Sequence, residues 1–165
     1  FVNSINARCF MNCYSLKTIQ IPQYLLTIEK DAFHNCSSLD DVFVPSSVES
    51  IGIYCFYGCE SLTKIEFGPG SLLKYIGEYA FHSCPNLKKI VIPDSVREIK
   101  MYSFCDCHEL AYVKLPSSLV SIENNSFYNC QFEEIEIPPK VGFIGIRAFA
   151  CNYKLKQIVI PPCVT

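Results

Sequence analysis

Hydrophobic and polar residues recur along this chain with a period near 23 residues. The clearest marker is a phenylalanine that returns after 23, 23, 25, 23, 23 and 22 residues. The seven markers are Phe10, Phe33, Phe56, Phe81, Phe104, Phe127 and Phe149. A fixed period of this length is typical of solenoids, in which small units stack and bury a core between neighbours. We therefore expect residues 1–165 to form a single solenoid of about seven repeats.

The segment after each marker phenylalanine predicts a short β-strand. With the phenylalanine counted as zero, hydrophobic residues occupy positions +6, +9 and +11, as in Leu39, Val42 and Val44. The alternation predicts inward side chains at +9 and +11 and outward side chains at +8 and +10. In most repeats a proline such as Pro45 follows and ends the strand, because proline lacks an N–H donor. Stacked copies predict a parallel β-sheet of short strands on the concave face of the solenoid.

The other half of each repeat has the spacing of a helix. Apolar or small residues stand at −5, −1, 0 and +3, as in Ile28, Ala32, Phe33 and Cys36. A repeat this short has no room for a long helix. We therefore expect turns and short 3₁₀ or α segments on the outer face, with a further short strand around residues 48–51.

Two repeats depart from the common length. One is two residues longer and replaces the usual proline with Gly68-Pro69-Gly70-Ser71, which predicts a surface bulge. Another loses a residue near Gln131. Both changes are interpreted as tolerated loop variation, with a binding loop at Gly68–Ser71 as the alternative.

Composition narrows the class of partner. Half of the residues are hydrophobic and the net charge is −2, with both signs scattered along the chain. This excludes the basic patch that nucleic acid or an anionic membrane requires. No apolar run approaches the roughly 18 residues of a membrane span. The sequence starts in mid-repeat with no signal-peptide pattern and no polar capping repeat, so we expect a fragment of a longer protein.

Eleven cysteines invite a disulfide or metal interpretation, but their position argues for packing. Six share the +3 position, where a small hydrophobic residue suits a tight inward turn. We expect buried and mostly reduced thiols there, and also at Cys9 and Cys55, which precede a marker phenylalanine. The six are Cys13, Cys36, Cys59, Cys84, Cys107 and Cys130.

The run Cys105-Asp106-Cys107-His108 resembles part of a metal site, but its repeat holds no second pair of ligands at the usual spacing. We therefore predict no metal and no cofactor. His34 and His82 lie two repeats apart in an outward column and should line one face without touching. Nothing predicts a thiol beside a base in a cleft. The sequence therefore predicts no catalytic residues and no enzyme.

The whole unit, L-x-x-I-x-I-P-x-S-V-x-x-I-G-x-x-A-F-x-x-C, resembles the BspA-like, Treponema pallidum-type leucine-rich repeats. Leu87 to Ile92, Pro93, Ser95-Val96, Ile99 and Phe104 follow it closely. Departures such as Phe132 for leucine, and Asn152 in the cysteine column, are minor. The resemblance implies a leucine-rich-repeat solenoid that serves as a binding scaffold, in a family regarded as surface or secreted proteins engaged in adhesion.

The outward strand positions are the candidate ligand-binding site, because repeat solenoids bind partners on extended, usually concave surfaces. Exposed aromatic and aliphatic groups beside charges favour a protein ligand. A row of tyrosines at −2, Tyr54, Tyr79 and Tyr102, is either an aromatic strip on the opposite wall or simple packing. The predicted binding residues are Phe43, Glu66, Lys89, Val91, Tyr112, Lys114, Glu136 and Val159.

Two functions remain open from the sequence. The first is a surface or secreted adhesion module whose ligand is a host matrix or cell-surface protein, as the resemblance implies. The second is a cytoplasmic scaffold for other proteins, which unpaired thiols favour.

Overall fold

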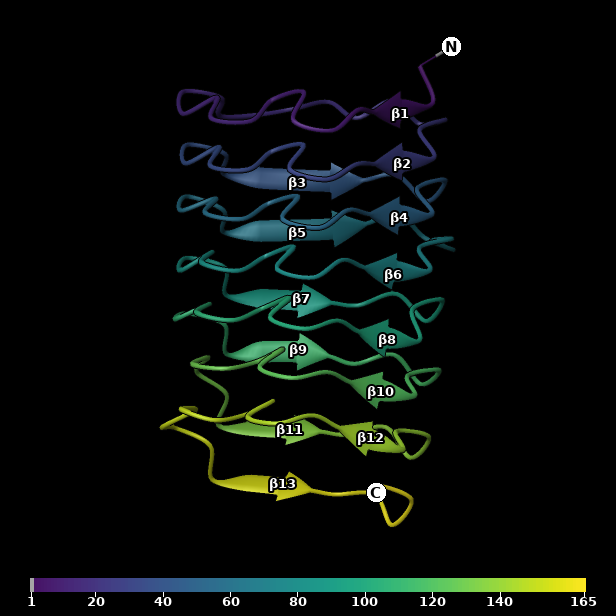
Figure 1. The fold of residues 1–165 in the computed structure, drawn as a ribbon, viewed down its shortest axis with the longest axis vertical. Coiled ribbons are helices and arrows are strands. Elements are labelled where there is room, and N and C mark those ends of the chain that lie inside the picture. The colour runs from purple at the N-terminus through teal and green to yellow at the C-terminus, as the bar shows by residue number, and fades with distance from the viewer. Residues whose placement is uncertain (1) are drawn as a thin grey trace.

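The computed structural model describes residues 2–165, which wind into coils stacked along the long axis of the molecule (Figure 1). Each full coil contributes a strand to one or both of two columns, which lie side by side in Figure 1. This confirms the predicted solenoid of short parallel strands.

The first column is a seven-stranded parallel sheet of two-residue strands. Each strand ends on the hydrophobic residue at position −5, and equivalent residues pair in register, as Ile5 does with Ile28. The strands are β1 (Ser4–Ile5), β2 (Thr27–Ile28), β4 (Ser50–Ile51), β6 (Tyr75–Ile76), β8 (Glu98–Ile99), β10 (Ser121–Ile122) and β12 (Phe143–Ile144). The short strand expected around residues 48–51 is β4, and it recurs in every coil.

The second column holds the strands predicted after each marker phenylalanine. The strands β3 (Asp41–Val44), β5 (Lys64–Phe67), β7 (Lys89–Val91) and β9 (Tyr112–Lys114) form a four-stranded sheet. The strands β11 (Glu134–Glu136) and β13 (Gln157–Val159) form a separate pair. The break between β9 and β11 falls in the shortened repeat near Gln131. In the first repeat, residues 18–21 are not assigned to a strand.

The expected 3₁₀ and α segments are wrong, because residues 2–165 contain turns but no helix. Two residues per coil, at −2 and +2, adopt positive φ, as Asp31 and Asn35 do at 57°. Left-handed residues interrupt a right-handed helix. The N–H groups at −2, 0 and +2 bond to the next coil, as when the Phe33 N–H donates to the Cys55 carbonyl at 2.8 Å, whereas those at −1 and +1 bond within their own coil. The apparent helical spacing at −5, −1, 0 and +3 therefore reflects the inward positions of a turning coil.

The marker phenylalanines form a continuous stack through the core. Neighbouring rings have centroids 5.2–5.6 Å apart and planes within 7° of parallel, from Phe10 to Phe149. The five interior rings are fully buried. In the shortened repeat, Phe132 packs edge-on against Phe127 at 5.7 Å. These rings are among the largest fully buried side chains of the core, and they fill the space between the two strand columns and the turns.

A second ladder, of thiols, runs beside the phenylalanines. The cysteine at +3 donates to the carbonyl of the phenylalanine one coil earlier, as Cys84 does to Phe56 at 3.1 Å. The same bond recurs from Cys36, Cys59, Cys107 and Cys130. Asn152 replaces it with an amide donor, 2.8 Å from the Phe127 carbonyl. This gives the cysteine column a hydrogen-bonding role beyond the small volume that the sequence suggested.

Burial sets the protonation of these thiols. Burial raises the pKa of Cys36 to about 11 and that of Cys84 well above the ordinary value. The predicted inward position is confirmed for Cys55, which is fully buried, but is wrong for Cys9, which is exposed. Within residues 2–165 the first coil packs against one neighbouring coil only, so its residue at −1, Cys9, has no preceding coil to bury it.

Replacement of Phe81 by alanine should destabilise the fold by about 3–5 kcal/mol, because it removes one buried ring from the middle of the stack. Phe10→Ala is the matched control and should cost less, since Phe10 is only half-buried. Urea unfolding of both variants measures the difference. Equal losses of stability would contradict an interior stack as the main source of cohesion.

Thiol labelling under native conditions should separate the cysteines by exposure. The exposed Cys9 and Cys163 should react first, together with Cys151, whose pKa is lowered by hydrogen bonds from Tyr128 and Tyr153. The seven buried thiols should react only after unfolding. Mass spectrometry of peptides from briefly labelled protein locates the modified residues. Early labelling of Cys84 would show that the ladder is open to solvent.

Candidate functional site: a hollow on the strand face

The outward side chains of β3, β5, β7, β9, β11 and β13 form one surface, which we call the strand face. Phe43 and Tyr112 are the prominent aromatic residues on it, and their exposed fractions are 52% and 54%. They lie on β3 and β9, the two edge strands of the four-stranded sheet. Two aromatic side chains thus stand on either side of the charged strands β5 and β7.

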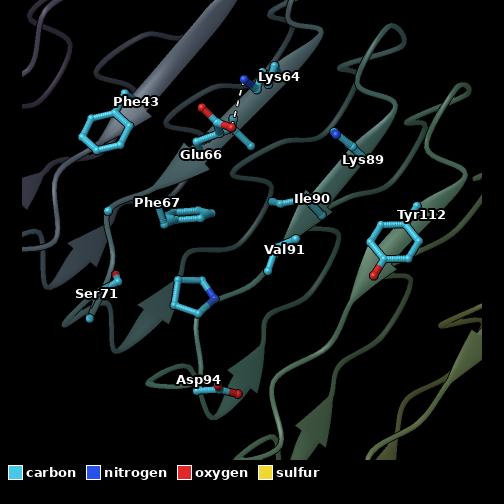
Figure 2. Close-up of a pocket in the computed structure, with 14 residues that line it drawn as sticks. Phe43, Lys64, Glu66, Phe67, Ser71, Lys89, Ile90, Val91, Asp94 and Tyr112 are labelled. Carbon is cyan, nitrogen blue, oxygen red and sulfur yellow. Dashed lines mark ion pairs between the residues drawn. The ribbon is translucent and has the colours of Figure 1, made fainter.

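A hollow of about 630 Å³ lies between these two aromatic residues. Figure 2 shows Phe43 and Tyr112 on opposite sides of it, with Phe67 and Val91 between them. The side chains that line the hollow include both positively and negatively charged groups. The charged and hydroxyl-bearing residues that line it are Lys64, Glu66, Ser71, Lys89, Asp94 and Tyr112.

The hollow owes its position to the longer repeat. β5 ends at Phe67, as β3 ends at the equivalent Val44, and Gly68 follows where other repeats have proline. The Gly68 N–H donates to the Val44 carbonyl at 2.9 Å, so Gly68 still makes a backbone hydrogen bond to the preceding coil. The chain turns away from that coil at Gly70, where φ is +67°. Gly68 and Gly70 themselves line the hollow. The two inserted residues therefore shape the wall of a candidate site.

The structure brings together five of the eight predicted binding residues. Phe43, Glu66, Lys89, Val91 and Tyr112 line the hollow. Lys114, Glu136 and Val159 belong to the strand face but not to the hollow. Glu136 and Val159 pair with each other on β11 and β13, beyond the break in the sheet.

Lys64, Phe67, Pro93 and Asp94 line the hollow but were not among the predicted binding residues, and Ser71 was predicted only as part of the alternative binding loop at Gly68–Ser71. Lys64 occupies an outward position, so the strand pattern already placed it on this face. The others stand at or after strand ends, where alternation no longer predicts direction. The extra length of the repeat at Gly68–Ser71 was the available signal for them.

The charges of the hollow are balanced. Lys64 Nζ lies 2.9 Å from Glu66 Oε1, and both side chains are about half exposed. An exposed pair of this kind contributes little to stability. Lys89 pairs in register with Lys64 and with Tyr112 on its two sides. Two lysines, a glutamate and an aspartate around apolar rings match a mixed protein surface better than a polyanion.

Aromatic residues on the turns form two columns at −2 and +1. Tyr79 stacks on Tyr54 and Tyr102, with centroids 4.7 Å apart in both cases. His34 and His82 do not touch each other, but Tyr57 lies between them and stacks on both, at 4.8 and 5.1 Å. The three tyrosines at −2 therefore form a continuous aromatic row in which each ring packs against its neighbour. Its rings stack on one another rather than presenting open faces.

In the Cys105-Asp106-Cys107-His108 run, the two cysteines are buried, Asp106 is partly exposed and His108 is exposed. Cys107 Sγ donates to the Phe81 carbonyl at 3.1 Å, which confirms its inward position. Burial and the nearby Asp106 carboxylate raise the pKa of Cys105 to about 12.

No helix within residues 2–165 is long and apolar enough to cross a membrane.

The family profile described as "BspA type Leucine rich repeat region (6 copies)" matches residues 3–90 and 74–165. The chain therefore belongs to the BspA-type leucine-rich-repeat family, as its repeat unit suggested. Proteins of this family are typically protein-interaction modules without catalytic activity. No curated protein sequence matches the chain.

Solved structures agree with this assignment. A leucine-rich repeat protein from Bacteroides ovatus is similar over 99% of this chain and 42% of its own, with 34% identity and a TM-score of 0.92. The T. pallidum leucine-rich repeat protein is 29% identical over 93% of this chain and 72% of its own, with a TM-score of 0.82. A leucine-rich cell surface protein from Faecalibacterium prausnitzii is 28% identical, with a TM-score of 0.63, over 85% of this chain and 45% of its own. The chain thus spans less than half the length of two of these proteins.

Proposed function

We propose that this chain is a non-catalytic recognition module that binds a protein partner through the strand face, with the hollow between Phe43 and Tyr112 as its centre. The hollow is the observation that carries the proposal. It combines exposed aromatic side chains with charges of both signs on a rigid sheet, which is the composition of a protein-binding site.

The family membership supports a surface role for the module. One structural neighbour is described as a cell surface protein, and the resemblance to BspA-like repeats implies adhesion. We therefore place the module at a cell surface or in a secreted protein, where its partner is a host matrix or cell-surface protein. Residues Lys114, Glu136 and Val159 extend the same face and serve as secondary contacts.

A second function is favoured by the thiols. All eleven cysteines are free in the structure, and disulfides are common in secreted proteins but rare in the cytosol. This favours an intracellular scaffold that uses the same face. Surface biotinylation of intact source cells distinguishes the two locations, because only an exposed protein is labelled.

Conversion of Phe43 and Tyr112 to aspartate should abolish recognition, because it removes both aromatic contacts and adds unpaired charge. The probe is a set of peptides selected from a displayed library against the unchanged chain. Each substitution should cost about 2 kcal/mol, which is an affinity loss of about 30-fold, measured by biolayer interferometry.

Two controls make this test specific. Ile146→Asp alters an exposed aliphatic residue away from the strand face and should leave binding unchanged. Val159→Asp tests whether the ligand reaches β13. Selected peptides that bind the Phe43→Asp/Tyr112→Asp variant as tightly as the parent would refute the hollow as the binding centre.

A further inference from the structure

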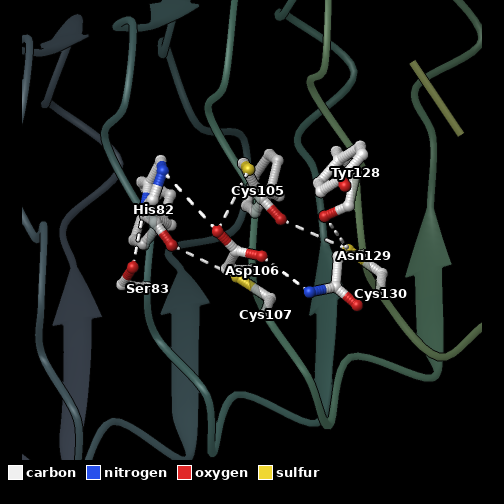
Figure 3. Close-up of polar contacts among 10 residues, drawn as sticks. His82, Ser83, Cys105, Asp106, Cys107, Tyr128, Asn129 and Cys130 are labelled. Atoms are coloured by element: carbon white, nitrogen blue, oxygen red, sulfur yellow. Dashed lines mark hydrogen bonds and ion pairs between the residues drawn. The ribbon is translucent and has the colours of Figure 1, made fainter. Parts of the chain in front are cut away.

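Three potential metal ligands converge on the outer turns, away from the strand face. They are His82 from one coil and Cys105 and Asp106 from the next, and their ligand atoms all lie within 4.8 Å of one another. Asp106 Oδ2 lies 3.8 Å from His82 Nε2 and 3.5 Å from Cys105 Sγ. Figure 3 shows the three side chains turned toward one another. The sequence shows Cys105 and Asp106 side by side, but it does not reveal His82 as their neighbour, because His82 lies one repeat earlier.

A second layer of hydrogen bonds orients two of these three ligands. His82 Nδ1 lies 2.7 Å from Ser83 Oγ, so a hydrogen bond there leaves Nε2 directed at Asp106. Asn129 Nδ2 donates to the other carboxylate oxygen of Asp106 at 2.7 Å. Metal sites characteristically hold their histidine and carboxylate ligands by such outer hydrogen bonds. These contacts hold the His82 and Asp106 side chains in the orientation that Figure 3 shows.

Packing also restricts the ligands. The imidazole of His82 is stacked against Tyr57 and Tyr79, at 5.1 and 5.6 Å, and its side chain is only 17% exposed. Cys105 is buried. Asp106 is 31% exposed and lines a shallow hollow of about 350 Å³, so the group remains open to solvent on one side.

We propose that His82, Cys105 and Asp106 bind a Zn²⁺ ion through Nε2, Sγ and one carboxylate oxygen. A thiolate, an imidazole and a carboxylate together suit zinc better than magnesium or calcium, which prefer oxygen ligands. Two ligand atoms on one tetrahedral zinc are separated by about 3.4 Å, so the observed group closes around the ion with side-chain movements of about 1 Å. The proton of the Cys105 thiol is released to solvent when the metal–sulfur bond forms.

Three protein ligands leave one zinc position open toward the shallow hollow. Water occupies it in the isolated chain. The site lies on the turns and not on the strand face, so it is independent of the protein-binding proposal and each stands or falls separately.

The test requires a chain without reactive surface thiols. Cys9, Cys151 and Cys163 are the accessible thiols that would bind zinc unspecifically, so all three are changed to serine, the residue that Ser83 provides at the position equivalent to Cys151. Cys163 Sγ bonds the Pro139 and Val141 carbonyls, each at 3.1 Å. Ser118 makes the equivalent pair of bonds in an earlier coil, so serine fits there. This triple variant is the parent for the measurements.

The ligand substitutions are His82→Tyr, Cys105→Ala and Asp106→Asn. Each installs the residue type that another coil carries at the equivalent position, namely Tyr57, Ala150 and Asn129. These variants should therefore fold, and circular dichroism verifies that they do. The control is His34→Tyr, the same change in the same column but without a neighbouring cysteine.

Titration calorimetry with Zn²⁺ should give one site in the parent and in His34→Tyr. Each ligand substitution should weaken zinc binding by at least about 100-fold, and Asn129→Ala should weaken it by about 10–100-fold. With Co²⁺ as the probe, the parent should show a thiolate-to-cobalt absorption band that Cys105→Ala lacks. Unchanged zinc affinity in a folded His82→Tyr or Asp106→Asn variant, or a Co²⁺ complex without that band, would overturn the proposal.

Discussion

Hydrogen bonds between the backbones of successive coils are the constraint on which the rest of this structure depends. They occur in both strand columns and also on the turns, where the Phe56 N–H donates to the Ala80 carbonyl at 2.8 Å. Successive coils are therefore held in register along both strand columns and along the turns. Each residue lies over its equivalent one repeat later, so a substitution is felt first by the same column in the neighbouring coils. This is why stability in such a fold is expected to be local to neighbouring repeats.

The two inner ladders follow from that register. Equal placement in every coil stacks the phenylalanine rings within 7° of parallel. It also brings five of the six thiols at +3 to the carbonyl of the phenylalanine one coil earlier, as with Cys130 and Phe104 at 3.2 Å. Changes in repeat length are accommodated only where they spare these columns. The insertion at Gly68–Ser71 falls after a strand and shapes the hollow, whereas the deletion near Gln131 interrupts the second strand column between β9 and β11.

The same register assembles both candidate sites from residues that are distant in sequence. On the strand face, adjacent coils bring Phe43, Lys89 and Tyr112 to one hollow, while the inward positions stay nearly constant. On the turns, one repeat of separation places His82 over Cys105. A solenoid can thus vary its outward columns without cost to the core. That freedom suits a family of protein-interaction modules.

The sequence alone determined the period, the inward columns and the strands after each phenylalanine, because these depend on local alternation and on repetition. It also placed Phe43, Glu66, Lys89, Val91 and Tyr112 on one outward face. Only the tertiary structure decided that the turns are not helical, since positive φ at residues such as Tyr54 and hydrogen bonds to the next coil leave no trace in hydrophobic spacing. The hollow and the meeting of His82 with Cys105 and Asp106 likewise depend on contacts across coils, which no single repeat contains.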